Sequence, residues 1–487
     1  MSKTLNYTDI LASNIAAISS AMAPVRASIG PKGLDVLLVD ELGSYSCTND
    51  GVEILSNIKI EHPAAKLAVE AAKSQETQVG DGTSTVAILC DSMLQAAMDK
   101  VNTGANPNRL AQALELAARK VQTELKASAM QVNELSDPAL RAITKIAARG
   151  DEDLTGLILE ALYIVKDAEK LAGSVFAQSG HKSQVLEGHF IKKRTHFNYS
   201  QNFEQAPLLL VQGPLEPEPM SSEAVNTDEG VRKYENNIQA LMETAKKIIK
   251  SGVKAVISSS SMFARVEEYF AREGVFVLTH VRDSDMRILE EISGSVVTTR
   301  SKLINSDIES IKALVNPLDS IKQMEDLSGY SFQGPKSSRA SILVSAQTPT
   351  ILEERQRITI DACRSLAAAT NLGYVLGEGV CELNLIPALQ ELKDQNQDEE
   401  TQMGIEIMLA ALNSIFDQIV GNAGFNSAEL KAKLKNPQLG IDLDSGSVVN
   451  LVEAGILDPL EVKLSAFKIA TEIACQILRI NMIVQAR

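Results

Sequence analysis

Long helical patterns of apolar positions occupy both ends of this chain, and a different pattern occupies its middle. The helical spacing extends over residues 10–28, 63–79, 85–101, 109–127, 351–369, 381–393, 400–419 and 459–480. Two short runs near the N-terminal end, 34–39 and 44–48, have the character of strands, and Glu41-Leu42-Gly43 between them predicts a hairpin. The pattern therefore predicts that both ends are mostly helical.

The middle of the chain alternates short β-rich runs with helical segments. The β-rich runs lie at 207–212, 253–258 and 275–279. Alternation of strand and helix is typical of a small α/β domain, which we expect over about 197–346. Because helical segments flank this region on both sides, the pattern predicts an α+β multidomain protein with an α/β domain inserted into a helical one.

Composition narrows the class of protein. With 487 residues, the chain is long enough for two to four domains. No run of eighteen apolar residues occurs, which predicts no membrane span, and a net charge of −15 argues against binding to nucleic acid. The five cysteines form no CxxC pair, which is typical of a reduced, cytoplasmic protein. The five histidines show no paired spacing, so a zinc site is not expected.

The segment with the most chemical content is Gly80-Asp81-Gly82-Thr83-Ser84-Thr85, which lies between two helical patterns. Glycines that allow close approach, hydroxyl groups and the N–H groups at a helix N-terminus together make a site for an anion. The carboxylate of Asp81 suggests phosphate bridged by Mg²⁺, because Mg²⁺ prefers one or two carboxylates and phosphate oxygens. A Gly-Asp-Gly turn without a ligand is the alternative.

Several ordered motifs resemble those of the chaperonin family, and the resemblance covers essentially the whole chain. At the N-terminal end the motifs are 28–35, 38–40, 48–55 and 61–66, followed by 80–85, and near the C-terminal end they are 422–424 and 448–463. The motif His62-Pro63-Ala64-Ala65-Lys66 is similar to the thermosome-type, group II branch. Gly455-Ile456-Leu457-Asp458-Pro459 is closer to the bacterial type. A thermosome-like protein or a divergent bacterial group III chaperonin fits this mixture.

The resemblance implies a chaperonin fold with three domains. Residues 1–148 and 377–487 would form a mostly helical equatorial domain that binds ATP. Residues 149–196 and 347–376 would form a small intermediate hinge domain. Residues 197–346 would form the apical domain that binds substrate protein, with a built-in lid near 215–234.

The resemblance also assigns roles to residues of the nucleotide site. Asp81 would hold Mg²⁺, Asp50 would help to position water and metal, and Asp361 would act on the attacking water. Asp458 would bind the ribose. The full set expected to contact the nucleotide is Ser28, Ile29, Gly30, Pro31, Asn49, Gly51, Gly82, Thr83, Ser84, Thr85, Gly377 and Asp458.

Each of these roles has a simpler structural interpretation. Gly30-Pro31 and Asp50-Gly51 are also common turn sequences. An isolated aspartate on a helix, such as Asp361, is ordinarily a solvated residue. Asp458 could instead cap the helix that follows Pro459.

Two departures from the family pattern affect the same site. Glu378 stands where the family has the second of three consecutive glycines, which places a negative side chain near a polyphosphate unless it points away. Arg149 stands where thermosomes carry a lysine that faces the γ-phosphate, and arginine differs from lysine in geometry.

The function implied by the resemblance is ATP-driven folding of non-native proteins inside a ring-shaped chamber. Subunits would form rings stacked in pairs, with hairpin 34–48 and the chain ends at the contacts between subunits. Apolar residues on the segment 260–272, namely Met262, Phe263, Val266, Tyr269 and Phe270, are candidates for client contact, although such a stripe is more typical of a core. A ring scaffold or holdase with weak or no ATPase activity is the alternative. A metabolic kinase or ligase is disfavoured because no GxxxxGK[ST] motif occurs.

Overall fold

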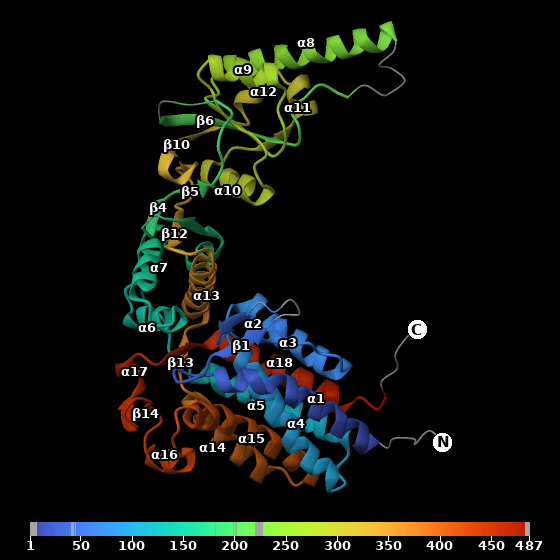
Figure 1. Cartoon of the computed structure of the whole chain (residues 1–487), viewed down its shortest axis with the longest axis vertical. Coiled ribbons are helices and arrows are strands. Elements are labelled where there is room, and N and C mark those ends of the chain that lie inside the picture. Colours follow the sequence, from blue (N-terminus) through green and yellow to red (C-terminus); the bar gives the residue numbers. More distant parts are fainter. Residues whose placement is uncertain are drawn as a thin grey trace. The chain divides into compact units, whose positions relative to one another are not determined.

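The computed structural model describes residues 7–39, 43, 45–180, 182–197, 199, 202–219 and 227–482. They divide into two compact units (Figure 1). The first unit joins the two ends of the chain, Met1–Thr155 and Ile360–Arg487, and the second is the central stretch Gly156–Thr359. The chain passes between the units inside helices α7 (Glu152–Val165) and α13 (Pro349–Leu372).

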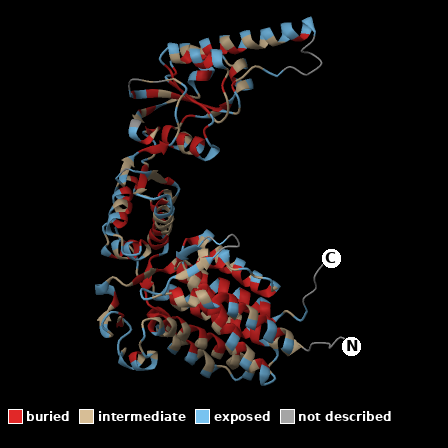
Figure 2. Ribbon diagram, in the orientation of Figure 1, coloured by how far each residue is buried: buried red, intermediate tan, exposed pale blue. Residues whose placement is uncertain are grey.

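The first unit is built on long helices that pack against one another. Helix α4 contacts four of the others, because apolar residues surround it and residues 86–91 are all buried. Figure 2 shows the buried positions running along the helices of this unit. The long helices are α1 (Tyr7–Ser28), α3 (Pro63–Val79), α4 (Thr83–Asn102), α5 (Pro107–Ala127), α14 (Val380–Gln395), α15 (Glu399–Asn422) and α18 (Leu460–Leu478).

Short strands and helices connect the long ones. The predicted hairpin is confirmed as β1 (Val36–Val39) paired with β2 (Tyr45–Thr48); Glu41 and Leu42 lie outside the described residues. Two further antiparallel pairs join β13 (Tyr374–Leu376) to β16 (Leu457–Pro459) and β14 (Leu439–Asp442) to β15 (Ser447–Asn450). The short helices are α2 (Gly51–Asn57), α6 (Pro138–Ala147), α16 (Ser427–Lys433) and α17 (Leu451–Ala454).

Two helices of this unit, α1 and α15, are long and apolar enough to cross a membrane by length and composition. In the structure α1 packs against α3 and α4, and α15 packs against α4, α5 and α14. Packing of this kind is typical of core helices in a soluble domain.

The second unit contains a seven-stranded mixed sheet. Its order is β5-β11-β10-β6-β7-β8, and β9 pairs with β6 beyond the end of β10. Strands β6, β7, β8 and β9 are parallel, whereas β10, β11 and β5 pair in antiparallel fashion. The strands are β5 (His189–Ile191), β6 (Phe203–Gln212), β7 (Ala255–Ser258), β8 (Phe276–Leu278), β9 (Val297–Thr299), β10 (Asn316–Met324) and β11 (Gly329–Gln333).

Helices cover both faces of this sheet. Alternate residues of β6 point to opposite faces, so Leu208 and Leu210 lie in one core and Leu209 and Val211 in the other. Helix α10 contributes to the first core, and α8, α9, α11 and α12 contribute to the second. These helices are α8 (Asp228–Lys250), α9 (Ala264–Arg272), α10 (Asp283–Ser293), α11 (Arg300–Asn305) and α12 (Ile308–Lys312).

The second core corrects one expectation about client binding. Met262, Val266 and Phe270 are buried in it, and Phe263 and Tyr269 pack against it half-buried. The apolar stripe on this segment is therefore mainly core, as its helical spacing already allowed. Of the expected lid segment 215–234, residues 220–226 lie outside the described residues.

A smaller sheet completes the second unit. Strand β12 (Ala340–Ala346) lies between β3 (Val175–Ser179), to which it is parallel, and β4 (Gln184–Glu187), to which it is antiparallel. Short 3₁₀ turns occur at η1 (Ala168–Lys170), η2 (Ala172–Ser174) and η4 (Glu325–Leu327).

Candidate functional site

The loop 80–85 has the backbone of a phosphate-binding turn. Helix α3 ends at Gly80 with φ 81°, and α4 begins after Gly82 with φ 92°, both in the left-handed region that favours glycine. A Cβ atom on Gly80 would clash with Arg364, and one on Gly82 would lie 2.8 Å from Val462 Cγ1. Because Gly82 is the N-cap and has no side chain, it leaves the first N–H groups of α4 without a capping partner.

Thr83 supplies a second sign that this helix end meets a ligand. Its residue is buried, and its Oγ1 has no hydrogen-bond partner among the described residues. Buried hydroxyl groups are ordinarily paired, so an orphaned one needs an explanation. A phosphate oxygen at the N-terminus of α4 would satisfy it.

The loop that carries Asp50 lies against the same helix end. A Cβ atom on Gly51 would be 2.9 Å from Ser84 Oγ. The Asp50 carboxylate accepts a hydrogen bond of 2.7 Å from the Glu53 N–H, so it does cap α2. Arg149 Nη2 lies 3.7 Å from the other Asp50 oxygen. The turn interpretation and the site interpretation therefore both apply to this loop.

The turn 28–31 is held by the end of helix α15. Asn422 Nδ2 donates hydrogen bonds to the carbonyl oxygens of Arg26, at 3.0 Å, and Ile29, at 2.9 Å. Gly30 has φ 86°, and a Cβ atom on it would lie 3.1 Å from Cγ2 of Ile419 in α15. The motif at 422–424 thus fixes a turn almost four hundred residues earlier in the chain.

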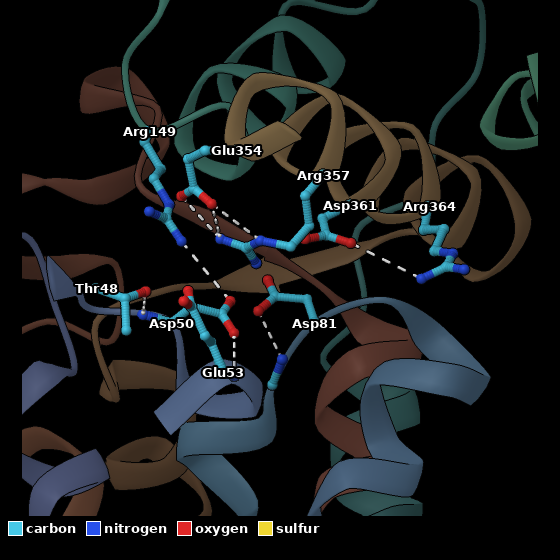
Figure 3. Close-up of polar contacts among 10 residues, drawn as sticks. Thr48, Asp50, Glu53, Asp81, Arg149, Glu354, Arg357, Asp361 and Arg364 are labelled. Carbon is cyan, nitrogen blue, oxygen red and sulfur yellow. Dashed lines mark hydrogen bonds and ion pairs between the residues drawn. The ribbon is translucent and has the colours of Figure 1, made fainter. Parts of the chain in front are cut away.

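Carboxylates from four segments converge beside the loop. In Figure 3, Asp81 lies between Asp50 and Asp361, and Arg364 Nη1 lies 3.8 Å from Asp361. Glu76, from the last turn of α3, also interacts with Asp50, Asp81 and Asp361. Burial, then repulsion by Asp361 and a hydrogen bond with it, raises the pKa of Glu76 to about 9.

Asp81 is affected in the same direction. Desolvation by the surrounding protein atoms, followed by repulsion from Asp458, raises the pKa of Asp81 to about 6. The residue nevertheless remains accessible to solvent. Negative charge is therefore concentrated here, and a bound cation would relieve the repulsion. Among the described residues no three His, Cys, Asp or Glu side chains are placed to hold a metal ion by themselves. Mg²⁺ fits such a site only with phosphate and water as its remaining ligands.

Sequence reasoning missed Glu76 and its neighbour Gln75. Gln75 is buried, and its Nε2 donates to the carbonyl oxygens of Asp81, at 2.9 Å, and Val462, at 3.1 Å. This side chain fastens the loop to the start of α18. The signal for Glu76 was an acidic residue in the last turn of a helix, where the helix dipole disfavours negative charge.

Asp458 lies on strand β16, opposite Val375 of β13. Its Oδ2 is 2.9 Å from Lys463 Nζ, which also lies 2.8 Å from Glu382 Oε1. The N-cap of α18 is Pro459, without a side-chain cap, so the capping alternative for Asp458 is wrong. Although burial alone would lower it, Asp458 and Glu382 hold the pKa of Lys463 well above its usual value.

Glu378 keeps the backbone conformation expected of a glycine at this position, and it differs only in carrying a carboxylate side chain. It adopts φ 59°, the left-handed region, and is 9% exposed. Its Oε2 accepts a hydrogen bond of 3.0 Å from the Ile441 N–H of strand β14. Burial, and then repulsion by Asp442 and Asp458, raises the pKa of Glu378 to about 7. The preceding Gly377 donates its N–H to the Ile456 carbonyl at 3.0 Å.

All the residues predicted for the site belong to the first unit. The contacts above bring together the segments 49–51, 80–85, 361 and 458. Gly377 joins them through its strand pairing with the segment around Asp458. The contacts given for 28–31 join that turn to the end of α15. The roles assigned to the individual residues remain predictions.

Comparison with known proteins identifies the class. Residues 22–487 match the model of the TCP-1/cpn60 chaperonin family, so the chain belongs to that family of ATP-dependent protein-folding proteins. It is 30% identical to the thermosome subunit beta of Archaeoglobus fulgidus, over 97% of this chain and 91% of that protein. A thermosome subunit of Methanopyrus kandleri gives the same identity and coverage.

A solved structure confirms the chaperonin fold. The crystal structure of a group III chaperonin in the open state matches with a TM-score of 0.88 and 30% identity, covering 97% of this chain and 98% of that one. The family and fold expected from the motifs are therefore confirmed. The alternative of a scaffold without ATP-dependent function is not favoured.

Proposed function

We propose that this chain hydrolyses ATP with Mg²⁺ in its first unit and uses the reaction to drive the folding of enclosed client proteins. The observation that carries the proposal is made at the N-terminal end of α4. A left-handed glycine backbone, a buried Thr83 hydroxyl without a hydrogen-bond partner among the described residues, and converging carboxylates occur together there. Family membership supports ATP hydrolysis and Mg²⁺ at the level of the family.

Each part of the loop has a distinct task in this proposal. The Gly82 N–H already donates to Asp81 Oδ1 at 2.6 Å. The N–H groups of residues 83–85 and the hydroxyls of Thr83, Ser84 and Thr85 would donate hydrogen bonds to phosphate oxygens. Asp81 would hold Mg²⁺, which supplies charge neutralisation on the phosphates when bound. Because the side chains of the described residues form no metal cage by themselves, we expect Mg²⁺ to bind mainly together with the nucleotide.

Asp361 would orient the attacking water and accept its proton. A carboxylate acts as a base only when ionised, and Asp361 here shares a hydrogen bond with Glu76. Because the pKa of Glu76 is raised to about 9, Glu76 would hold the proton of this bond and leave Asp361 to carry the charge. Asp50 would hold the water from the opposite side, with Arg149 near the transferred phosphate. Ser28, Ile29, Gly30, Pro31, Asn49, Gly51 and Gly377 would line the nucleotide, and Asp458 would bind its ribose.

We also propose the three-domain division given above and assembly into stacked rings in the cytoplasm. The hairpin β1–β2 favours a contact between subunits, because Leu37, Val39 and Tyr45 are 63%, 65% and 80% exposed. Large apolar side chains gathered on one small hairpin are typical of an interface. Ring closure requires such head-to-tail contacts.

Three measurements test the proposal. Purified protein should hydrolyse ATP in a Mg²⁺-dependent manner, and negative-stain images should show rings. ATP-dependent recovery of a denatured client enzyme would then link hydrolysis to folding. A stable monomer without ATPase activity would contradict the proposal, and rings without ATPase activity would revive the scaffold alternative.

A further inference from the structure

Two carboxylates at the Asp458 end of the site share an unusual arrangement. Each is fixed through one oxygen by a protein group, and each has a second oxygen that accepts no hydrogen bond from the described residues. For Asp458 the fixing group is the Lys463 ammonium, at 2.9 Å from Oδ2. For Glu378 it is the Ile441 N–H, at 3.0 Å from Oε2. Asp458 Oδ1 and Glu378 Oε1 are therefore both available as acceptors.

The two side chains belong to the same local framework. Asp458 lies on β16, opposite Val375 of β13, and Glu378 follows that strand after Gly377. The backbone bond from Gly377 to Ile456 extends the pairing to the residue before Glu378. Asp458 also repels Glu378, so the two carboxylates are close enough to interact.

Glu378 is costly where it stands. A non-glycine residue in the left-handed region is strained, and a buried carboxylate beside Asp442 and Asp458 is repelled by both. Glycine would avoid both penalties. Strain of this kind persists where the surrounding structure holds it in place, and it gathers at functional sites. The bond to Ile441 by itself only joins the loop to the hairpin β14–β15.

We propose that Glu378 is a specificity-determining residue that accepts a hydrogen bond from the nucleotide sugar, so that it and Asp458 together recognise the two hydroxyls of a ribose. The inference rests on the proposed function, because it assumes that nucleotide binds here. Two neighbouring hydroxyls are two donors, and the two free carboxylate oxygens are two acceptors. A sugar that lacks either hydroxyl leaves one of these acceptors without its partner in the complex, so the analogue should bind less tightly than ribose does.

Binding of diphosphates tests this without any hydrolysis. Calorimetry on assembled protein with Mg²⁺ would compare ADP, 2′-deoxy-ADP and 3′-deoxy-ADP. We expect the unmodified protein to bind ADP at least tenfold more tightly than at least one of the two analogues, 2′-deoxy-ADP or 3′-deoxy-ADP. Glu378→Gly should still bind ADP but reduce that preference to about threefold or less, the part that Asp458 supplies.

Two further variants separate sugar recognition from charge and from folding. Asp442→Asn removes one negative charge beside Glu378 and should keep the full preference for ADP. Glu378→Gln keeps the side-chain length and an acceptor for Ile441, so its thermal stability shows whether the hairpin is intact. An unchanged preference in folded Glu378→Gly, or an equal loss in Asp442→Asn, would overturn the inference. Failure of the unmodified protein to bind ADP at all would instead overturn the proposed function.

Discussion

The proposed phosphate end of the site, around the loop 80–85, and its proposed sugar end, around Asp458, differ in how negative charge is arranged. At the phosphate end, Asp50, Glu76, Asp81 and Asp361 crowd together, and the pKa values of Glu76 and Asp81 rise. At the sugar end, Asp458 and Glu382 share the buried ammonium of Lys463. The first arrangement is incomplete without a cation, whereas in the second an internal cation offsets part of the negative charge.

This difference indicates what each end is built for. Repulsion that a ligand relieves favours the liganded state, so the phosphate end gains most when Mg²⁺ and nucleotide arrive together. A carboxylate held by an internal ion pair keeps its geometry in every state, which suits recognition of a neutral group such as a sugar hydroxyl. Substitutions at the phosphate end should therefore affect turnover, and those at the sugar end should affect stability and selectivity.

The largest effect is expected at the phosphate end from Asp361→Ala. Loss of the group that accepts the proton from water should lower ATP turnover about 100- to 10,000-fold. Affinity for ADP should change less than about threefold, because the proposed role concerns water and not the nucleotide. Single-turnover hydrolysis and calorimetry measure the two quantities. Asp394→Ala, which removes an exposed carboxylate of the same unit, is the control. Normal turnover in Asp361→Ala would remove this residue from the mechanism.

At the sugar end, Lys463→Met should mainly destabilise the fold. It leaves Glu382, which is fully buried, without its cation, and breaking such a buried pair costs about 3–5 kcal/mol of unfolding free energy. The double variant Lys463→Met with Glu382→Met should recover more than half of the loss, because no buried charge is then left unpaired. Chemical denaturation of the four proteins in this cycle gives the coupling. A loss of unfolding free energy below about 1 kcal/mol in Lys463→Met would mean that the ion pair between Lys463 and Glu382 does not stabilise this part of the fold.

The pH dependence of stability should reveal Glu378. Its pKa is raised in the folded state from 4.5 to about 7, so the folded state binds the proton more tightly than the unfolded state does. The resulting stabilisation is fully present below pH 4.5 and is lost as the pH rises through 7. Without nucleotide, Glu378→Gln should therefore gain stability over the unmodified protein between pH 5 and 8, by roughly 3 kcal/mol at most. A difference in unfolding free energy that stays constant over this range would contradict the prediction.

The smallest effect on stability is expected from Gly82→Ala. The left-handed backbone makes a Cβ atom cost about 1–2 kcal/mol, and this one would also approach Val462. Affinity for ADP should fall about tenfold as the loop shifts. Gly104→Ala is a matched control, since Gly104 has φ 100° and no atom within 4 Å of its Cβ position. Equal loss of ADP affinity in both variants would show that strain, and not the phosphate loop, is responsible.

Local sequence predicted the phosphate end much better than the sugar end. The loop 80–85 and Asp50 lie in short motifs whose backbone roles follow from glycine and helix-end chemistry. Glu382 and Lys463 are far apart in the sequence, and only tertiary packing brings them into contact. Likewise, β13 and β16 are three residues each and pair across a long separation, so their pattern carries almost no signal.

In the rest of the fold, too, local patterns were predicted better than features that depend on tertiary packing. Helices with a sustained apolar pattern were predicted close to their observed limits, as in α3, which covers Pro63–Val79 as expected. The face of a helix was harder to interpret, since apolar residues that bind a client and those that form a core have the same spacing. Val266 and Phe270 could be assigned to the core only once the sheet beneath them was known.

The two passages between the units lie inside α7 and α13, and this has a mechanical consequence. A loop of small polar residues is a flexible linker. A continuous helix instead resists bending, because its backbone hydrogen bonds must lengthen or break. Asp361 is the second residue of the first unit along α13. A rotation of the central unit would therefore move α13 as a whole, and with it the residue that we propose to act on water.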